Sequence, residues 1–333
     1  MSRRPDRQRK RRVSHRGSQA LLTWNDDLLA QPGSLQDLMR RFLDWQQVRN
    51  YSPATLKTRT SVLLLFAHFC EERGLVVARD IARPHIERYQ AFLARYRKPD
   101  GKPLSVRTQC SRLHTLRVFF TWAVKQHFLP ANPASDLDMP RPTKPIPVFL
   151  TAEEVRRVFA LPDVDDLTGL RDRAILEVLY STGIRRAEAA ALRVDDIDAE
   201  AGLVRINRGK GGKDRLIPIG LRALGWLDRY QENARLVWHR DVSVAELFLD
   251  ADGGPMTPGQ VSAIVGRYLK TAEITKPGCC HLFRHTFATA LLNAGCDMRY
   301  IKDMLGHANM NTTAHYAQVS VERLKQMHAA FHP

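Results

Sequence analysis

The residues best suited to chemistry gather in one stretch near the carboxyl end of the sequence. Four histidines, an arginine and a tyrosine lie close together there on an otherwise apolar, helix-like background: His281, Arg284, His285, His307, His315 and Tyr316. Two chemistries use such a cluster. Histidines can hold a metal ion, or cations and a nucleophile can handle a phosphate group. The rest of the sequence must decide between them.

A metal site explains this cluster poorly. His281 and His285 are four residues apart, about one helical turn, which is the spacing of two zinc ligands on a helix. The glutamate that acts as general base in such a motif is missing, because Leu282, Phe283 and Arg284 fill the interval. Arg284 would also place a positive charge beside a divalent cation. We therefore expect no metal ion and no other cofactor.

A phosphate site uses the same residue types well. Displacement at a phosphodiester concentrates negative charge on the non-bridging oxygens, so fixed cations around them lower the barrier. Arginine suits this task because its guanidinium grips two oxygens and keeps its charge. The sequence offers Arg185 and Arg284 as such cations, with His281 one helical turn before Arg284. It also offers Lys210 as an acid for the departing oxygen and Tyr316 as a covalent nucleophile.

Four short boxes make the chain resemble a known family. They are TGIRRAEAAAL, GKGGKDRLIPI, HLFRHTFAT and LGHANMNTTAHY. In this order they resemble the boxes of the tyrosine site-specific recombinases, and the chain is most similar to the Xer and phage-integrase group. The spacing agrees too, with 25 residues from Arg185 to Lys210 and nine from His307 to Tyr316.

The resemblance implies a role for each cation. Arg185 and Arg284 would clamp the scissile phosphate, and His281 and His307 would complete the cradle around it. Glu188 matches an acidic position of the family and would support Arg185. The alternative for Glu188 is an exposed surface carboxylate.

The resemblance also implies the acid and the nucleophile. Lys210 would protonate the leaving 5′ oxygen, although Lys213 on the same turn competes for this assignment and is otherwise a candidate DNA contact. Tyr316 would form a 3′-phosphotyrosyl bond that keeps the energy of the broken phosphodiester, so the family rejoins DNA without ATP and without a metal. We expect His285 to be a packed helix residue and His315 to lie at the surface.

The composition favours a polyanionic partner. The 333 residues suffice for two domains, and 44% of them are hydrophobic, which excludes a wholly disordered chain. Lys and Arg outnumber Asp and Glu by 51 to 35, a net charge of +16. Five irregularly spaced cysteines indicate reduced thiols, and no apolar run approaches the length of a membrane span. We expect a cytoplasmic protein associated with the bacterial nucleoid, with no membrane partner.

The elements that must position these residues divide the chain into four segments. Residues 1–33 form a basic arm that we expect to be disordered; it could bind DNA or simply be solvated. Residues 34–129 carry four amphipathic helical patterns and should fold as an all-α core-binding domain. Residues 130–150 read as a proline-rich linker, and residues 151–333 as the catalytic domain with a C-terminal exchange helix.

The expected fold class is mainly α with one small β element. In the catalytic domain, LVRIN at 203–207 and DRLIPI at 214–219 predict a β-hairpin whose turn carries Lys210. Two basic domains joined by an extended linker could close around duplex DNA as a C-shaped clamp. The outward faces of the first domain offer a set of backbone contacts: Arg49, Lys57, Arg59, Arg107, Arg112 and Arg117. Any one of them alone is most simply a solvated charge.

The resemblance implies the partners as well. They are double-stranded DNA at a specific core site, expected to be an inverted repeat, and three further subunits or a related recombinase on two duplexes. Val321, Leu324 and Phe331 fall on one stripe of the last helix, which would dock on a neighbouring subunit or pack on its own. The expected reaction is integration, excision or resolution of a mobile element. The alternatives are a chromosome-dimer-resolving Xer-type enzyme, a type IB topoisomerase and a catalytically silent DNA-binding regulator.

Overall fold

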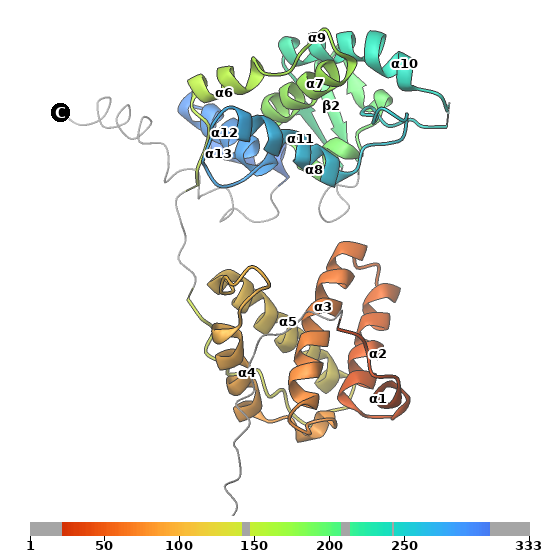
Figure 1. The fold of residues 1–333 in the computed structure, drawn as a ribbon, viewed down its shortest axis with the longest axis vertical. Coiled ribbons are helices and arrows are strands. Elements are labelled where there is room, and N and C mark those ends of the chain that lie inside the picture. Colours follow the sequence, from red (N-terminus) through yellow and green to blue (C-terminus); the bar gives the residue numbers. More distant parts are fainter. Residues whose placement is uncertain (1–21, 142–146, 208–213, 242, 307–333) are drawn as a thin grey trace, which may run out of the picture. The chain divides into compact units, whose positions relative to one another are not determined.

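The fold is described by a computed structural model that covers residues 22–141, 147–207, 214–241 and 243–306 (Figure 1). The chain divides into two compact units, residues 1–144 and residues 145–333, each with a buried apolar core of its own. Both are mostly helical, and the second contains one small antiparallel sheet, as the sequence predicted. Among the described helices, none has the length and apolar character needed to cross a membrane.

The first unit is built from helices, three of which begin after a serine cap. Its helices are α1 (Asp26–Ala30), α2 (Leu35–Val48), α3 (Pro53–Glu71), α4 (Arg83–Arg95) and α5 (Val106–Lys125), with a 3-10 turn at Ala78–Asp80. Ser34, Ser52 and Ser105 each accept a hydrogen bond from the backbone N–H three residues later, which satisfies one open donor of the helix that follows. Their apolar faces meet in an aromatic core that includes Phe66 and Tyr89, whose ring centroids are 4.8 Å apart.

Part of the segment predicted to be a disordered arm is folded. Leu22 and Trp24 pack against the core of the first unit, and the side chain of Asn25 caps α1. The basic residues that suggested disorder lie in residues 1–17, outside the described part of the chain. The apolar residues after them bury surface, which offsets the entropy cost of ordering this segment.

Much of the predicted linker also belongs to the first unit. Leu137 is buried in the core, and the Arg117 guanidinium donates to the carbonyls of Ala134 and Leu137 at 3.0 and 2.9 Å. Arg117 therefore binds its own chain and is only partly exposed, whereas we predicted that it faces outward. Prolines prevent regular structure here, but they do not prevent packing, so residues 130–141 are folded against α5.

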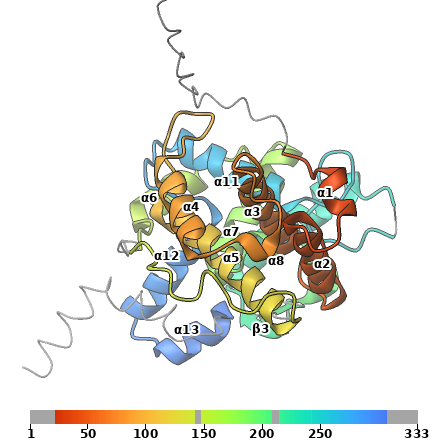
Figure 2. The same ribbon diagram turned by 90° about the horizontal axis from the view of Figure 1, so that it is seen from below.

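The second unit consists of helices and a small sheet. Its elements are α6 (Ala152–Phe159), α7 (Leu167–Thr182), α8 (Arg186–Ala190), a 3-10 turn (Val194–Asp196), β1 (Ile197–Asp198), β2 (Leu203–Ile206), β3 (Arg215–Pro218), α9 (Leu221–Tyr230), a π-helical turn (Gln231–Arg235), α10 (Leu236–Trp238), α11 (Pro258–Thr271), α12 (Cys280–Asn293) and α13 (Met298–Leu305). A capping box opens α6, where Thr151 and Glu154 each accept the other's backbone N–H. Helix α13 lies beside α12 (Figures 1 and 2).

The predicted hairpin is present as the pair β2 and β3. The strands are antiparallel, with Leu203 opposite Pro218 and Ile206 opposite Arg215. Strand β1 pairs with the other side of β2 and was not predicted, because two residues are too few to show an alternating pattern. The turn at residues 208–213 lies outside the described residues.

Candidate active site

The site begins where the central helix α7 ends. Gly183 follows α7 in the left-handed conformation, with φ of 60°, which a residue with a side chain rarely adopts. A Cβ at this position would lie 2.5 Å from Cδ1 of Phe287 on α12. Glycine therefore allows α12 to approach the end of α7, and it turns the chain toward Arg185.

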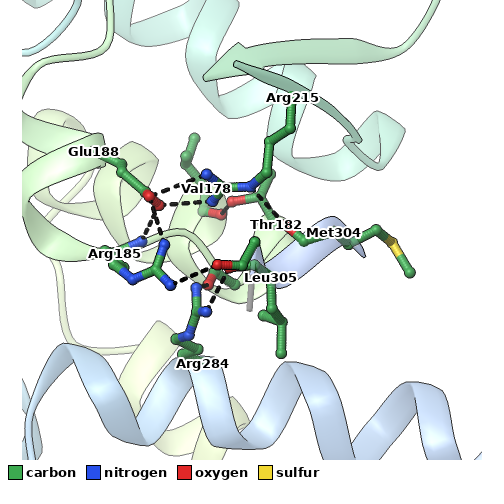
Figure 3. A network of polar contacts seen from close by, with 10 residues as sticks. Val178, Thr182, Arg185, Glu188, Arg215, Arg284, Met304 and Leu305 are labelled. Carbon is green, nitrogen blue, oxygen red and sulfur yellow. Dashed lines mark hydrogen bonds and ion pairs between the residues drawn. The ribbon is translucent and has the colours of Figure 1, made fainter. Parts of the chain in front are cut away.

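Arg185 is held in place by an acidic partner one turn later. It precedes α8, and its backbone N–H donates to Glu188 Oε2 at 2.8 Å, while its Nη1 donates to Glu188 Oε1 at 2.7 Å (Figure 3). The Glu188 side chain is only 8% exposed, so the alternative of a surface carboxylate is wrong. Burial by itself raises the pKa of Glu188, but hydrogen bonds from Arg215 and Arg185 outweigh it and leave the pKa below its ordinary value.

A third arginine reaches the same carboxylate from the sheet. Arg215 opens β3, and its two Nη atoms donate to Glu188 Oε1 and Oε2 at 3.0 and 2.8 Å. Its Nε donates to the carbonyl of Met304 at 2.9 Å. Arg215 therefore joins the start of β3 to α8 and to the end of α13 (Figure 3).

Arg284 is the most deeply buried arginine of the cluster, at 4% exposure. It rises from α12, and its Nη1 and Nη2 donate to the carbonyls of Gly183 at 2.8 Å and Leu305 at 2.6 Å (Figure 3). Both of these carbonyls lie at the ends of helices, where backbone oxygens lack a helical partner. Two helix ends therefore hold this guanidinium in one orientation.

The carboxyl end of α13 binds all three arginines. The carbonyls of Met304, Leu305 and Gly306 accept from Arg215, Arg284 and Arg185 respectively. The last distance, from Arg185 Nη2 to the Gly306 oxygen, is 3.1 Å. A helix carries partial negative charge at this end, which favours nearby cations. Because the three carbonyls are consecutive, they bring together the arginine before α8 and the arginines of β3 and α12.

The cluster keeps an excess of positive charge. Three arginines and Glu188 carry formal charges of +3 and −1, which leaves +2 among these four side chains. Each guanidinium has five N–H donors, and the hydrogen bonds of the Arg185 side chain to Glu188 and Gly306 use two of them. The arrangement can therefore bind an anion with donors that are already oriented, without rearranging the protein.

His281 lies on the first turn of α12, and its side chain is exposed. The surrounding protein nevertheless removes part of the water around the imidazole, and this desolvation lowers the pKa of His281. The positive charges of Arg284, Arg186 and Arg185 lower the pKa further. His285, one turn further, is less exposed, and burial, His281 and Arg284 lower its pKa to about 4. Both rings are therefore mainly neutral at pH 7. In the described part of the chain, no three metal-binding side chains come together.

Other predicted site residues lie outside the described residues. They are Lys210, Lys213, His307, His315 and Tyr316. The described elements end close to them, because β2 and β3 flank the turn with both lysines and Gly306 directly precedes His307. Of the predicted phosphate-binding residues, the structure thus brings Arg185 and Arg284 together with Glu188 and places His281 one turn before Arg284.

Comparison with known proteins decides the family. Residues 148–323 match the model of the phage integrase family, and residues 38–128 match that of the phage integrase N-terminal SAM-like domain. The tyrosine recombinase XerC 2 of Ralstonia nicotianae is 44% identical over 290 residues, which cover 86% of this chain and 82% of that protein. The tyrosine recombinase XerD of the same organism is 34% identical over 313 residues, which cover 92% of this chain and 97% of that protein.

The chain belongs to the phage integrase family. It is a Xer-like tyrosine recombinase, an enzyme that cuts and rejoins DNA strands in site-specific recombination. The family predicted from the four sequence boxes is confirmed.

Solved structures of other recombinases share the fold. The XerH site-specific recombinase bound to palindromic difH substrate in a post-cleavage complex is 22% identical, with a TM-score of 0.67 over 86% of this chain and 83% of that chain. A lambda integrase dimer bound to a COC′ core site is 19% identical, with a TM-score of 0.64 over 85% of this chain and 95% of that chain. At such low identity these similarities confirm the mainly helical fold class alone.

The DNA contacts predicted in the first unit of the recombinase fall into two kinds. Lys57 on α3 and Arg107 on α5 are exposed, and so is Arg49, which lies over the ring of Trp45 at 4.7 Å. Moving such side chains toward a phosphate costs little free energy, because they are exposed and their charges are in water.

Arg59 and Arg112 are partly buried instead. Their guanidinium groups lie over the rings of Tyr51 and Tyr96 at 4.9 and 5.5 Å. In each, Nη1 is buried and has no hydrogen-bond partner among the described residues. A buried donor without a partner is unfavourable, so these arginines would gain from an added acceptor.

The prediction of site residues missed Arg215 of the recombinase. This arginine stands in the box GKGGKDRLIPI, where a basic turn passes into an alternating strand, and that position was the available signal. Its partners are far away along the chain, 27 residues earlier at Glu188 and 89 residues later at Met304. No local pattern connects such positions.

Proposed function

We propose that this recombinase cuts and rejoins duplex DNA at a specific core site through a covalent bond between Tyr316 and a 3′ phosphate. The observation that carries the proposal is the pair Arg185 and Arg284, whose guanidinium groups are fixed side by side on the neighbouring carbonyls of Gly306 and Leu305. The two arginines bind the non-bridging oxygens of the scissile phosphate, and His281 and His307 complete the cradle. A bound anion also favours the protonated form of His281, whose pKa is otherwise lowered by desolvation and by the nearby arginines.

The bond changes balance without another reactant. The Tyr316 oxygen attacks phosphorus and loses its proton to solvent, and the bond from phosphorus to the 5′ oxygen breaks. Lys210 gives that oxygen a proton. The phosphotyrosyl bond retains the energy of the original linkage, so a 5′ hydroxyl of the same or another strand reverses the step without ATP. Fixed cations stabilise the transition-state charge, which makes a metal ion unnecessary.

Recognition and assembly follow from the rest of the chain. In the first unit, Arg49, Lys57, Arg59, Arg107 and Arg112 contact the DNA backbone, and Lys213 adds a contact beside the scissile phosphate. Base contacts select a core site with inverted repeats. The helix after Tyr316 docks on a neighbouring subunit, which builds a tetramer on two duplexes.

Two cellular uses compete within this function. The first is integration, excision or resolution of a mobile element, which the long basic arm before the first unit favours. The second is resolution of chromosome dimers, which the similarity to proteins named XerC and XerD favours. The position of the core site separates the two, because it lies either at the ends of a mobile element or at one chromosomal site.

Covalent trapping tests the proposal. Wild type and Tyr316→Phe are mixed with genomic DNA of the source organism in EDTA and quenched with detergent, and the protein-linked DNA ends are sequenced. We expect adducts at one 3′ end sequence with wild type and none with Tyr316→Phe. Tyr300→Phe is the matched control, because Tyr300 is a tyrosine on α13 that is 67% exposed. It should form adducts like wild type.

The other outcomes identify the alternatives. Adducts at scattered sequences would indicate a type IB topoisomerase. Specific binding without any adduct would indicate a silent DNA-binding regulator. Adducts that persist in Tyr316→Phe would assign the nucleophile to another residue.

A further inference from the structure

Arg215 binds two separate parts of the candidate site at once. Its Nε donates to the Met304 carbonyl at 2.9 Å, and its two Nη atoms donate to both carboxylate oxygens of Glu188 at 3.0 and 2.8 Å. The side chain is only 11% exposed, so these bonds are shielded from water (Figure 3). A planar guanidinium can make all three contacts, whereas a lysine ammonium cannot span both partners.

The end of α13 is shaped to admit this guanidinium. Gly306 closes the helix with φ of 62°, and a Cβ there would lie 3.2 Å from Cζ, Nε and Nη1 of Arg215. A glycine therefore permits the guanidinium to pass over the helix end. The bond from Arg215 to Met304 depends on this close approach.

Arg215 also stands at a junction in the chain. It is the first residue of β3, five residues after Lys210. Met304 and Gly306 close α13 directly before His307. The contacts of Arg215 thus fix where the strand after the turn with Lys210 starts, relative to the arginine cluster and to the end of α13.

We propose that Arg215 is a positioning residue that fastens the β2–β3 hairpin to Glu188 and α13, so that Lys210 is held beside the leaving 5′ oxygen. The inference rests on the proposed function, in which Lys210 donates the proton to that oxygen. Arg215 touches neither the DNA nor the reacting atoms. Its loss slows cleavage because the acid is misplaced, while the phosphate clamp made by Arg185 and Arg284 retains most of its contacts.

A substrate that needs no acid isolates this effect. In a 5′-bridging phosphorothiolate, sulfur replaces the leaving oxygen and departs as a thiolate without taking a proton. Single-turnover cleavage of oxygen and sulfur substrates carrying the core site is measured for wild type, Lys210→Ala, Arg215→Gln and Arg215→Lys. The full chain is used throughout, and DNA binding and thermal melting of each variant are recorded.

We expect Arg215→Gln to cleave the oxygen substrate about 10²-fold more slowly than wild type, within the range of a lost general acid. On the sulfur substrate its rate should return to within about tenfold of wild type, as for Lys210→Ala. Arg215→Lys should behave like Arg215→Gln, because it keeps the charge and loses the three-point contact. In the Lys210→Ala background, Arg215→Gln should cause almost no further loss on the oxygen substrate.

Arg222→Gln is the matched control. Arg222 is also an arginine paired with a buried carboxylate, that of Glu177, but its own side chain is 58% exposed and it lies on α9 away from the cluster. The Arg222→Gln variant should cleave both substrates at the wild-type rate.

Equal losses on both substrates would overturn the inference, because they indicate general damage to the fold or to the phosphate clamp. Additive losses in the double variant would overturn it as well. If Arg215→Gln fails to fold, the cleavage rates of Arg215→Lys on the oxygen and sulfur substrates test the inference instead. A wild-type chain that cleaves neither substrate at a mapped core site would instead overturn the proposed function itself.

Discussion

Replacing Glu188 with glutamine removes one charge from the arginine cluster and keeps the shape of the side chain. The carboxylate accepts four hydrogen bonds, two from Arg185 and two from Arg215, at 2.7 to 3.0 Å. An amide has one oxygen, so two of the four donors would face an NH2 group instead of an acceptor. The variant therefore leaves two arginines close together with only part of their hydrogen bonding.

The size of the effect follows from burial. Glu188 is 8% exposed and Arg215 is 11% exposed, and removing one partner of a buried ion pair costs about 3 kcal/mol or more. For a domain of about 150–250 residues, about 3 kcal/mol lowers the melting temperature by about 6–12 °C. Calorimetry of the full chain should show this shift for Glu188→Gln. Glu200→Gln, which removes an exposed carboxylate from the same unit, should shift by less than about 2 °C.

The pH dependence gives the prediction a second test. Because its folded pKa lies below the ordinary value of 4.5, Glu188 stabilises the fold above pH 4.5, and this contribution is lost as the pH falls through the folded pKa. The difference in melting temperature between wild type and Glu188→Gln should thus be largest at pH 7 and should become smaller below pH 4.5. The reasoning would be refuted if Glu188→Gln had the melting temperature of wild type at pH 7, or if the difference in melting temperature did not change with pH.

Three further predictions concern other parts of the chain. Gly183→Ala places a Cβ 2.5 Å from the Phe287 ring at a φ of 60° and should cost about 3 kcal/mol, measured by denaturant unfolding; a loss below about 1 kcal/mol would contradict this. Arg117→Met removes two hydrogen bonds to carbonyls, so amide hydrogen exchange should accelerate in residues 130–141 and stay unchanged in the second unit. Since His285 has a pKa of about 4 in the folded chain, wild type loses stability as the pH falls from 6.5 to 4, and His285→Gln should lose less over that window.

The features that sequence predicted well are those decided by neighbours along the chain. An amphipathic helix depends on apolar residues three or four positions apart, and the four helical patterns predicted in residues 34–129 are found as α2, α3, α4 and α5. The hairpin depends on two alternating runs around a glycine-rich turn. The family boxes depend on residue type at fixed spacing, which is why Arg185 and Arg284 could be paired before their positions were known.

The features that sequence missed depend on distant residues. Residues 130–141 contain prolines and no periodicity, yet they are folded because Arg117 binds their carbonyls and Leu137 enters the core. The role of Arg215 depends on Glu188 and Met304, which no local rule connects with it. Tertiary contacts decided both cases.

The end of α13 explains how three like charges can share one site. Its consecutive carbonyls, from Met304 to Gly306, offer each arginine a backbone acceptor and a negative partial charge without adding a full negative charge. A second glutamate in their place would lower the positive charge of the cluster further and compete with a phosphate. The carbonyls instead orient Arg185 and Arg284 and leave most of their positive charge available. The single carboxylate, Glu188, balances only part of that charge, and an incoming phosphodiester balances a further part, so binding of DNA and stability of the cluster are coupled.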